Sequence, residues 1–338
     1  MRSGPSSTRE SSGRRWLRRI LVVGGLAALS WFAWQVDWPG TFRVLARLGW
    51  ALPLVFVPYL LVYFADTAGW RSCFGHPPRL SWLRFLRIRW AGEAVNNVIP
   101  SGHVGGEAVK VLLLRRHGVS GHDGVPAAVI SKTLQSVSQL AFLGLGAWCF
   151  LALGTAPAAF RQAMGGLLAI GTVALLAWVA LQRRGLFASL NSVVRRFRAG
   201  DTRWGRKLAE WDGLDARIVG FRRNHPYRFA GALAFYGLGW LLDATEILVF
   251  AVLTGTPLSV EQAVAIEAFV GVAKGLTVFI PGALGVQEGS IVFLCRMAGV
   301  DETFGAAYAL IRRLRDVVFA SIGWKLLLLD RVRLRDLA

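Results

Sequence analysis

Two stretches of this chain, NVIPSGHVGGEAVKVLLLRRHGV at residues 97–119 and VFIPGALGVQEGSIVFLCRMAGV at residues 278–300, align without a gap. Residue 97 therefore matches residue 278, and this constant spacing is called the repeat offset below. Eight aligned positions are identical, among them Pro100 with Pro281 and Glu107 with Glu288. Each copy is an apolar stretch that Pro and Gly interrupt, with one Glu soon after the interruption. In membrane proteins, paired interrupted segments in matching positions of two halves point to a transport site.

The composition predicts an all-α polytopic membrane protein. Of 338 residues, 54% are hydrophobic and only 17% are charged, and the mean hydropathy is +0.46, which is outside the usual range of soluble domains. A helix needs about 20 predominantly apolar residues to cross a bilayer. Runs of that length predict six transmembrane helices, near residues 17–36, 50–70, 124–153, 158–181, 228–254 and 303–329.

The repeated motif lies in two further apolar stretches, at residues 88–117 and 262–299. We expect each to form a helix, a break and a second helix that enter and leave the membrane on the same side. Irregular backbone survives at membrane depth only where protein or a water-filled cavity surrounds it. The residues that we expect to form the breaks are Pro100, Gly105 and Gly106 in the first copy and Pro281, Gly282 and Gly285 in the second.

The net charge of +19 is concentrated in alternate loops, together with the two terminal segments. This distribution is the positive-inside pattern and predicts that both termini are cytoplasmic. Basic segments on that side attract anionic lipid headgroups. Because the charge follows the loops of a membrane protein, we expect no nucleic-acid partner.

The predicted spans divide the chain into two membrane halves. Three spans in each half turn the second half upside down, which gives an inverted repeat with oppositely oriented hairpins. The segment between the halves is basic and amphipathic, and it forms either helices on the membrane surface or a solvated linker. The divisions are a tail at 1–16, a first half at 17–182, the basic segment at 183–227, a second half at 228–329 and a tail at 330–338.

Charged residues inside the apolar stretches are the candidates for function, because ionisable groups are costly at membrane depth. Arginine matches phosphate oxygens with a planar pair of donors, so the cluster on the last span is a candidate phosphate clamp. The alternative is internal ion pairing with acidic residues such as Asp316. The candidate substrate-binding residues are Glu107, Glu288, Arg312, Arg313, Arg315, Lys132, Asn97 and Lys274, and Lys132 matches Arg313 at the repeat offset.

The two motif glutamates, Glu107 and Glu288, have a structural and a functional interpretation. A Glu in the first turn of a helix gains about 0.3–1 kcal/mol from the helix dipole, and it also accepts a free backbone N–H. The functional alternative is a pair of carboxylates near the membrane midplane that meet amine or hydroxyl groups of a substrate. The three cysteines and five histidines show no metal-ligand spacing. We therefore expect no metal, no cofactor and no catalytic residue.

The run GEAVNNVIPSGHVGGE at 92–107, together with PGALGVQEG at 281–289, resembles the transmembrane domain of the lysylphosphatidylglycerol synthases and their stand-alone flippase-like relatives. The resemblance covers nearly the whole chain. It implies a domain that flips or handles lipids in the plasma membrane of bacteria or archaea. The full-length synthases carry a soluble transferase domain after the membrane part, and we expect this chain to lack that domain and its activity.

These patterns lead us to expect a lipid translocase in the bacterial inner membrane, with an anionic phospholipid or a lipid-linked sugar or hopanoid-type lipid as its cargo. Two other classes remain open: an integral-membrane lipid-modifying transferase, and an accessory membrane subunit of a lipid or glycan pathway. The expected partners are membrane lipids with anionic headgroups. A biosynthetic enzyme and a second copy of the chain are further candidate partners.

Overall fold

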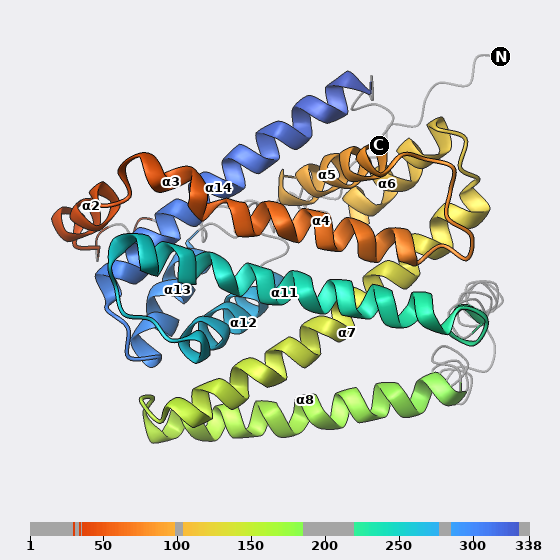
Figure 1. Ribbon diagram of the computed structural model, residues 1–338. Coiled ribbons are helices and arrows are strands. Elements are labelled where there is room, and N and C mark those ends of the chain that lie inside the picture. Colours follow the sequence, from red (N-terminus) through yellow and green to blue (C-terminus); the bar gives the residue numbers. More distant parts are fainter. Residues whose placement is uncertain are drawn as a thin grey trace, which may run out of the picture.

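The computed structural model describes residues 36–98, 104–184, 220–276 and 285–330, together with Ser30 and Trp34. These residues form only helices and the connections between them (Figure 1). The helices are α2 (Trp38–Ala46), a short 3-10 helix η1 (Gly49–Ala51), α3 (Leu52–Val55), α4 (Val57–Ser72), α5 (Trp82–Val98), α6 (Val104–Arg116), α7 (Gly121–Leu153), α8 (Ala158–Arg184), α11 (Pro226–Thr254), α12 (Val260–Leu276), α13 (Val286–Met297) and α14 (Glu302–Leu329).

The ends of the long helices follow from local sequence signals. Ser120 caps α7 by accepting the backbone N–H of Asp123 at 3.2 Å, and Asp301 caps α14 by accepting that of Phe304 at 3.0 Å. Side-chain oxygens at these positions satisfy donors that have no partner inside the helix. Gly154 ends α7 at a φ of 66°, a left-handed conformation that glycine adopts without steric cost. The caps therefore fix where each span begins and ends.

Three helical stretches among the described residues are long and apolar enough to cross a membrane: Gly49–Ser72, which comprises η1, α3 and α4, then α7 and α11. The helices α8 and α14 have 27 and 28 residues, which at 1.5 Å per residue is about 40 Å and also sufficient. The middle of α14 is less apolar because it carries the arginine cluster. Of the six predicted spans, the first, 17–36, lies almost entirely outside the described residues.

The order of the helices repeats along the chain. The series α4, α5, α6, α7 is followed by α11, α12, α13, α14, and the last residues of equivalent helices are separated by close to the repeat offset. Thus α6 ends at Arg116 and α13 at Met297, while α7 begins at Gly121 and α14 at Glu302. The turn between them repeats as well, because Gly118 and Gly299 both have a positive φ, of 82° and 75°. The similarity seen in the motif therefore extends over four helices.

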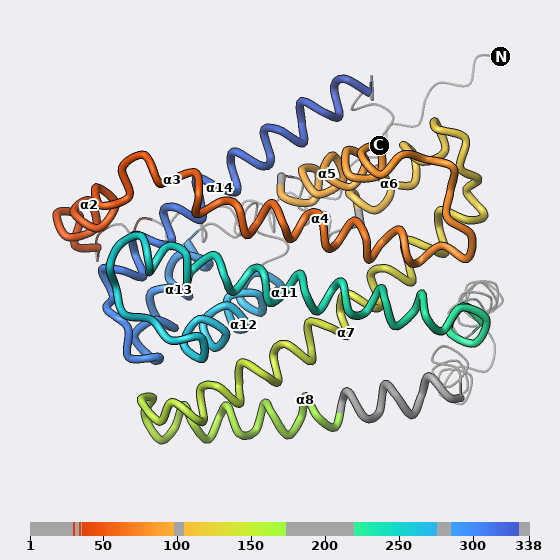
Figure 2. The backbone as a smooth tube through the Cα atoms, viewed as in Figure 1, coloured from red at the N-terminus to blue at the C-terminus, as the bar shows by residue number. Residues whose placement is uncertain are grey.

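The two series interlock rather than stand apart. In Figures 1 and 2, α4 runs from left to right and α11 from right to left directly beside it. Helix α7 of the first series packs on α12 of the second, and α14 of the second packs on α5 of the first. The largest buried cluster joins α7, α11, α12, α13 and α14 around Phe150, Phe250 and Tyr308. Helix α8 lies at one side of the bundle against α7.

Each repeated motif lies between two packed helices, α5 with α6 and α12 with α13. Gly105 and Gly106, which we expected in the first break, instead lie in the first turn of α6. The physical reason is that Gly106 lets the α6 backbone approach α5, since a Cβ there would overlap the carbonyl oxygen of Gly92. Gly285 precedes α13 at a φ of 77°. Pro100, Pro281 and Gly282 lie outside the described residues, as does residue range 185–219 of the basic segment.

Candidate functional site

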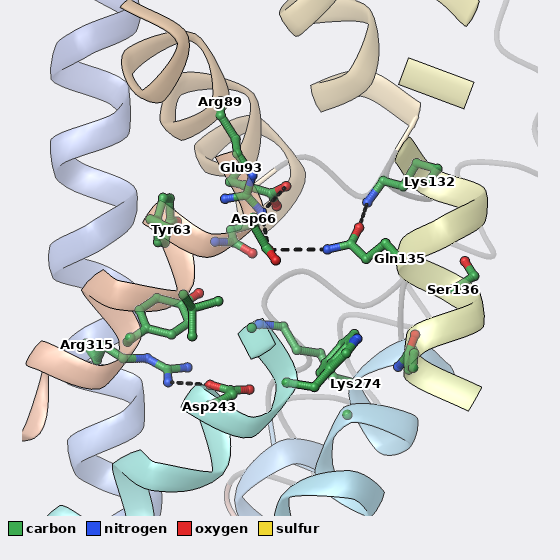
Figure 3. A pocket seen from close by; sticks show the side chains of 18 of the residues that line it. Tyr63, Asp66, Arg89, Glu93, Lys132, Gln135, Ser136, Asp243, Lys274 and Arg315 are labelled. Carbon is green, nitrogen blue, oxygen red and sulfur yellow. Dashed lines mark hydrogen bonds and ion pairs between the residues drawn. The ribbon is translucent and has the colours of Figure 1, made fainter. Parts of the chain in front are cut away.

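A cavity of about 410 Å³ lies where the two helix series meet. Its walls come from α4 and α5 of the first series, α11 and α12 of the second, and the long helices α7 and α14. Figure 3 shows side chains from these helices pointing into the same space. The lining is strongly charged for a site inside a helical membrane bundle: five residues are cationic (Arg89, Lys132, Lys274, Arg312, Arg315) and three are acidic (Asp66, Glu93, Asp243).

On the first-series side, the charges form a chain across the cavity wall. Arg89 on α5 forms an ion pair with Asp66 on α4, and both side chains are buried, with exposed fractions of 6% and 9%. The amide nitrogen of Gln135 donates to the same Asp66 oxygen, Oδ2, at 3.5 Å, and the amide oxygen of Gln135 accepts from Lys132 at 3.1 Å (Figure 3). Glu93 lies one turn from Arg89, at 3.9 Å. The chain thus links α4, α5 and α7.

On the second-series side, two arginines of α14 are held by carboxylates of α11 and α12. Arg312 forms an ion pair with Glu267 on α12 and a second one with Asp243 on α11 at 3.3 Å. Arg315 pairs with Glu246 on α11, and it also contacts Asp243 at 3.5 Å (Figure 3). The guanidinium of Arg315 lies over the ring of Tyr59, 3.6 Å from its centroid, a cation–π arrangement. Both arginines are among the residues that line the cavity, with side chains that are 4% and 0% exposed.

The two motif glutamates make equivalent contacts outside the cavity lining. Glu288 accepts the backbone N–H of Gly285 at 2.9 Å, so it caps α13, and it also accepts from Arg313 Nε at 2.7 Å. Glu107 lies 3.5 Å from Lys132, the position that matches Arg313, and 2.5 Å from Lys110. Each motif glutamate therefore links the second helix of its hairpin to the long helix that follows, which combines the capping and arginine-pairing interpretations for Glu288.

Three pairs of residues that line the cavity are equivalent in the repeat. At the repeat offset, Tyr59 corresponds to Trp240, Val62 to Asp243 and Glu93 to Lys274. A cavity that contains both members of such pairs lies at the junction of the two series. The equivalent positions differ in charge, however, with Glu93 on one side and Lys274 on the other.

Of the predicted substrate-binding residues, the structure brings five together in the cavity lining: Asn97, Lys132, Lys274, Arg312 and Arg315. Glu107, Glu288 and Arg313 lie elsewhere, in the two links described above. The sequence-based prediction missed Asp66, Arg89 and Gln135. A signal existed for Asp66, because it is an acidic residue inside a predicted span. Arg89 follows several other arginines, so the sequence alone groups it with the basic loop after that span.

Among the described residues, no group of three or more His, Cys, Asp or Glu side chains is arranged to hold a metal ion. Cys73, Cys149 and Cys295 are all buried free thiols. The side chains that line the cavity present charges and hydrogen-bonding groups.

The chain belongs to the family described as the lysylphosphatidylglycerol synthase TM region, which matches residues 16–323. The match leaves only residues 1–15 and 324–338 outside it, so no soluble synthase domain lies within these 338 residues. No curated protein and no solved structure matches the chain. Together with the apolar helices, the family shows a multi-pass integral membrane protein of a class associated with the translocation of membrane lipids.

Proposed function

We propose that this protein is a lipid translocase and that the cavity receives the phosphate-bearing headgroup of an anionic phospholipid or a lipid-linked sugar. The observation that carries the proposal is the cavity itself, a charged site at the junction of two repeated helix series within a membrane protein. Its volume of about 410 Å³ lies in the range of ordinary small-molecule sites, about 300–1,000 Å³. The acyl chains of the lipid would remain in the bilayer while the headgroup crosses.

The lining provides groups for both parts of such a headgroup. Lys132 on α7 and Lys274 on α12 are partly accessible cations, and the guanidiniums of Arg312 and Arg315 would add donors that suit phosphate oxygens. Glu93 would accept from hydroxyl or amine groups. A mixed lining of this kind, with more cationic than acidic residues, would recognise an anionic headgroup by its pattern of charges.

The two series form an inverted repeat in this proposal, with six spans, two oppositely oriented hairpins and both termini in the cytoplasm. The antiparallel courses of α4 and α11 support this arrangement. Rocking of one series against the other would open the cavity to each side of the membrane in turn, which is the usual mode of transporters built from inverted repeats.

The proposal is tested with purified protein in liposomes that contain fluorescent phosphatidylglycerol, whose exposed fraction is followed with a membrane-impermeant quencher. Lys132→Gln and Lys274→Gln each remove one cavity cation, and we expect each to slow flipping by at least about tenfold, the effect of losing roughly 1.4 kcal/mol of headgroup interaction. The matched control is Lys325→Gln, the same change at an exposed position on α14.

Two outcomes would overturn the proposal. One is that liposomes with wild-type protein flip none of the anionic or glycosylated lipids offered faster than protein-free liposomes do. The other is equal flipping by wild type, Lys132→Gln and Lys274→Gln. The same liposomes, supplied with a labelled donor, distinguish a transferase, because that class of protein would change the lipid chemically and leave its sidedness unchanged.

A further inference from the structure

The ion-pair cluster behind the cavity contains more carboxylates than the guanidiniums that hold them. Around Arg312 and Arg315 lie four acidic side chains: Asp243 and Glu246 from α11, Glu267 from α12, and Asp316 from α14 itself. Lys274 on α12 is a third cation at the same cavity wall. As the described residues form it, the cluster therefore has one more acidic group than cations. An excess charge in a membrane interior is costly unless a further cation neutralises it.

Glu246 is the carboxylate of this cluster whose hydrogen bonding is incomplete among the described residues. Its side chain is wholly enclosed, with 0% exposure, and its Oε2 accepts from Arg315. Its Oε1 is buried and has no hydrogen-bond partner among the described residues. The other fully enclosed carboxylate of the cluster, Glu267, accepts from both Tyr308, at 2.7 Å, and Arg312. A buried oxygen without a donor is unusual and calls for an explanation such as a bound proton.

The surroundings of Glu246 leave Arg315 as its principal counter-charge. Asp243 lies one turn earlier on the same helix and also contacts Arg315. The charged and titratable groups that face Glu246 from neighbouring elements are Arg312, Arg315 and Tyr308 on α14 and Glu267 on α12, in addition to Asp243 on α11. Two of these groups are acidic, so Glu246 depends strongly on the guanidinium of Arg315.

We propose that Glu246 binds a proton when a headgroup phosphate engages Arg315, so that the lipid and the proton cross the membrane together. The inference rests on the proposed function and names the ion that accompanies transport. The step transfers one proton: the carboxylate of Glu246 takes it from water in the cavity and becomes a neutral carboxylic acid. When the phosphate leaves, the proton returns to water on the other side.

The physical cause is competition for one guanidinium. Arg315 is among the residues that line the cavity, and its enclosed side chain, with 0% exposure, neutralises the carboxylate of Glu246. A phosphate that shares Arg315 leaves Glu246 with less counter-charge, and a buried carboxylate without a partner takes up a proton. Asp243, whose side chain is 16% exposed and lines the cavity, provides the route for that proton between cavity water and Glu246.

Linkage fixes the sign of the pH effect. If the phosphate promotes protonation of Glu246, then protonation must increase the affinity for the phosphate by the same factor. Headgroup affinity therefore rises as the pH falls, by at most about tenfold per pH unit for one linked proton. A sodium ion is the other monovalent cation that could accompany the lipid, but it needs several free oxygen ligands. In the described part of the cluster, Glu246 Oε1 is the one buried carboxylate oxygen without a hydrogen-bond partner.

The first experiment uses the liposome assay with labelled phosphatidylglycerol in the outer leaflet. For wild type, an acidic outside should accelerate inward movement and an alkaline outside should slow it, by up to about tenfold per pH unit. In Glu246→Gln, which cannot change its charge, the rates should no longer depend on the pH gradient. The matched control, Glu302→Gln at an exposed position on the same bundle, should keep the wild-type dependence. A wild-type rate that follows a sodium gradient and ignores the pH gradient would overturn the proposal.

A second experiment does not depend on transport. Infrared difference spectroscopy of the purified protein should show a protonated carboxyl band that appears when phosphatidylglycerol is added, and this band should be absent in Glu246→Gln. If the band is missing in wild type although lipid binds, the proton assignment is wrong while the translocase remains. If lipid neither binds nor flips, the proposed function itself has failed, and the band would then not appear in any variant.

Discussion

The two motif glutamates are the most informative residues at the smallest scale. Glu288 is nearly enclosed, caps α13 through Gly285 and accepts from Arg313. Glu107 makes the equivalent contact with Lys132 at 3.5 Å. Their common task is to hold the second helix of each hairpin against the long helix that follows. They belong to the scaffold of the cavity, and the lining is supplied by other residues.

This assignment predicts a graded loss of stability at Glu288. Glu288→Ala removes the acceptor of the buried Gly285 N–H and breaks the ion pair with Arg313, and we expect a loss of about 3 kcal/mol, as for other broken buried pairs. Glu288→Gln keeps the helix cap and should lose less. The measurement is thermal unfolding in detergent. Glu302→Ala, which breaks an exposed ion pair with Arg296, should cost less than about 1 kcal/mol. Equal stability of wild type and Glu288→Ala would contradict the capping role.

Residue-level prediction from the sequence succeeded where the repeat provided a second copy. The repeat offset matches Lys132 to Arg313, and the structure gives both the same kind of partner, a motif glutamate. It could not show that Arg313 faces away from the cavity while its neighbours Arg312 and Arg315 line it, because that depends on how α14 is rotated in the bundle. The pairing of Arg89 with Asp66 joins two helices and has no local sequence pattern either.

At the scale of the helix, the first hairpin depends on close contact between α5 and α6. Gly92 and Gly106 face each other at this contact, and Asn96 accepts the backbone N–H of Gly106 at 2.8 Å. The two glycines allow the backbones to approach as in other small-residue helix contacts in membranes. The two helices of the hairpin thus pack closely beside the cavity, and Glu93 and Asn97 of α5 line that cavity.

Gly106→Ala tests this contact. The added Cβ would overlap the carbonyl oxygen of Gly92, which is backbone and cannot swing aside, so we expect a loss of about 1–3 kcal/mol in the free energy of unfolding. Gly166→Ala on α8 is the matched control, because nothing lies within 4 Å of its added Cβ. That change should be neutral or slightly stabilising, since alanine favours helix more than glycine does. Equal unfolding temperatures for the two variants would show that the contact is looser than the structure has it.

The helices and their order could be read from the sequence because apolar runs and caps are local signals. The sequence predicts spans at 124–153 and 228–254, and the observed helices α7 and α11 begin within three residues of them. The position of the first break was less accurate. Glycine signals a break or a close approach of two backbones, and Gly105 and Gly106 belong to a helix where the second explanation applies at Gly106. Only the packing partner distinguishes the two.

At the scale of the whole molecule, two interlocked helix series share one cavity. The crossed packing of α7 with α12 and of α5 with α14 places each long helix against the hairpin of the other series. In the proposed mechanism, movement of one series against the other would change the access to the cavity and leave each hairpin intact. The three equivalent pairs in the lining, such as Glu93 with Lys274, place the cavity where the two series meet. The opposite charges of Glu93 and Lys274 show that the two copies differ within the cavity lining.

Alternating access of this kind requires the two series to have opposite orientations in the membrane, and that requirement is directly measurable. His122 at the start of α7 and Glu302 at the start of α14 are exposed and nearly equivalent positions. In a background whose three buried cysteines are replaced by alanine, His122→Cys and Glu302→Cys are labelled with a membrane-impermeant maleimide, in intact cells and in inverted membrane vesicles. We predict that Glu302→Cys reacts from the outside and His122→Cys from the cytoplasmic side. Labelling of both positions from the same side would contradict the inverted repeat and, with it, the proposed mechanism of transport.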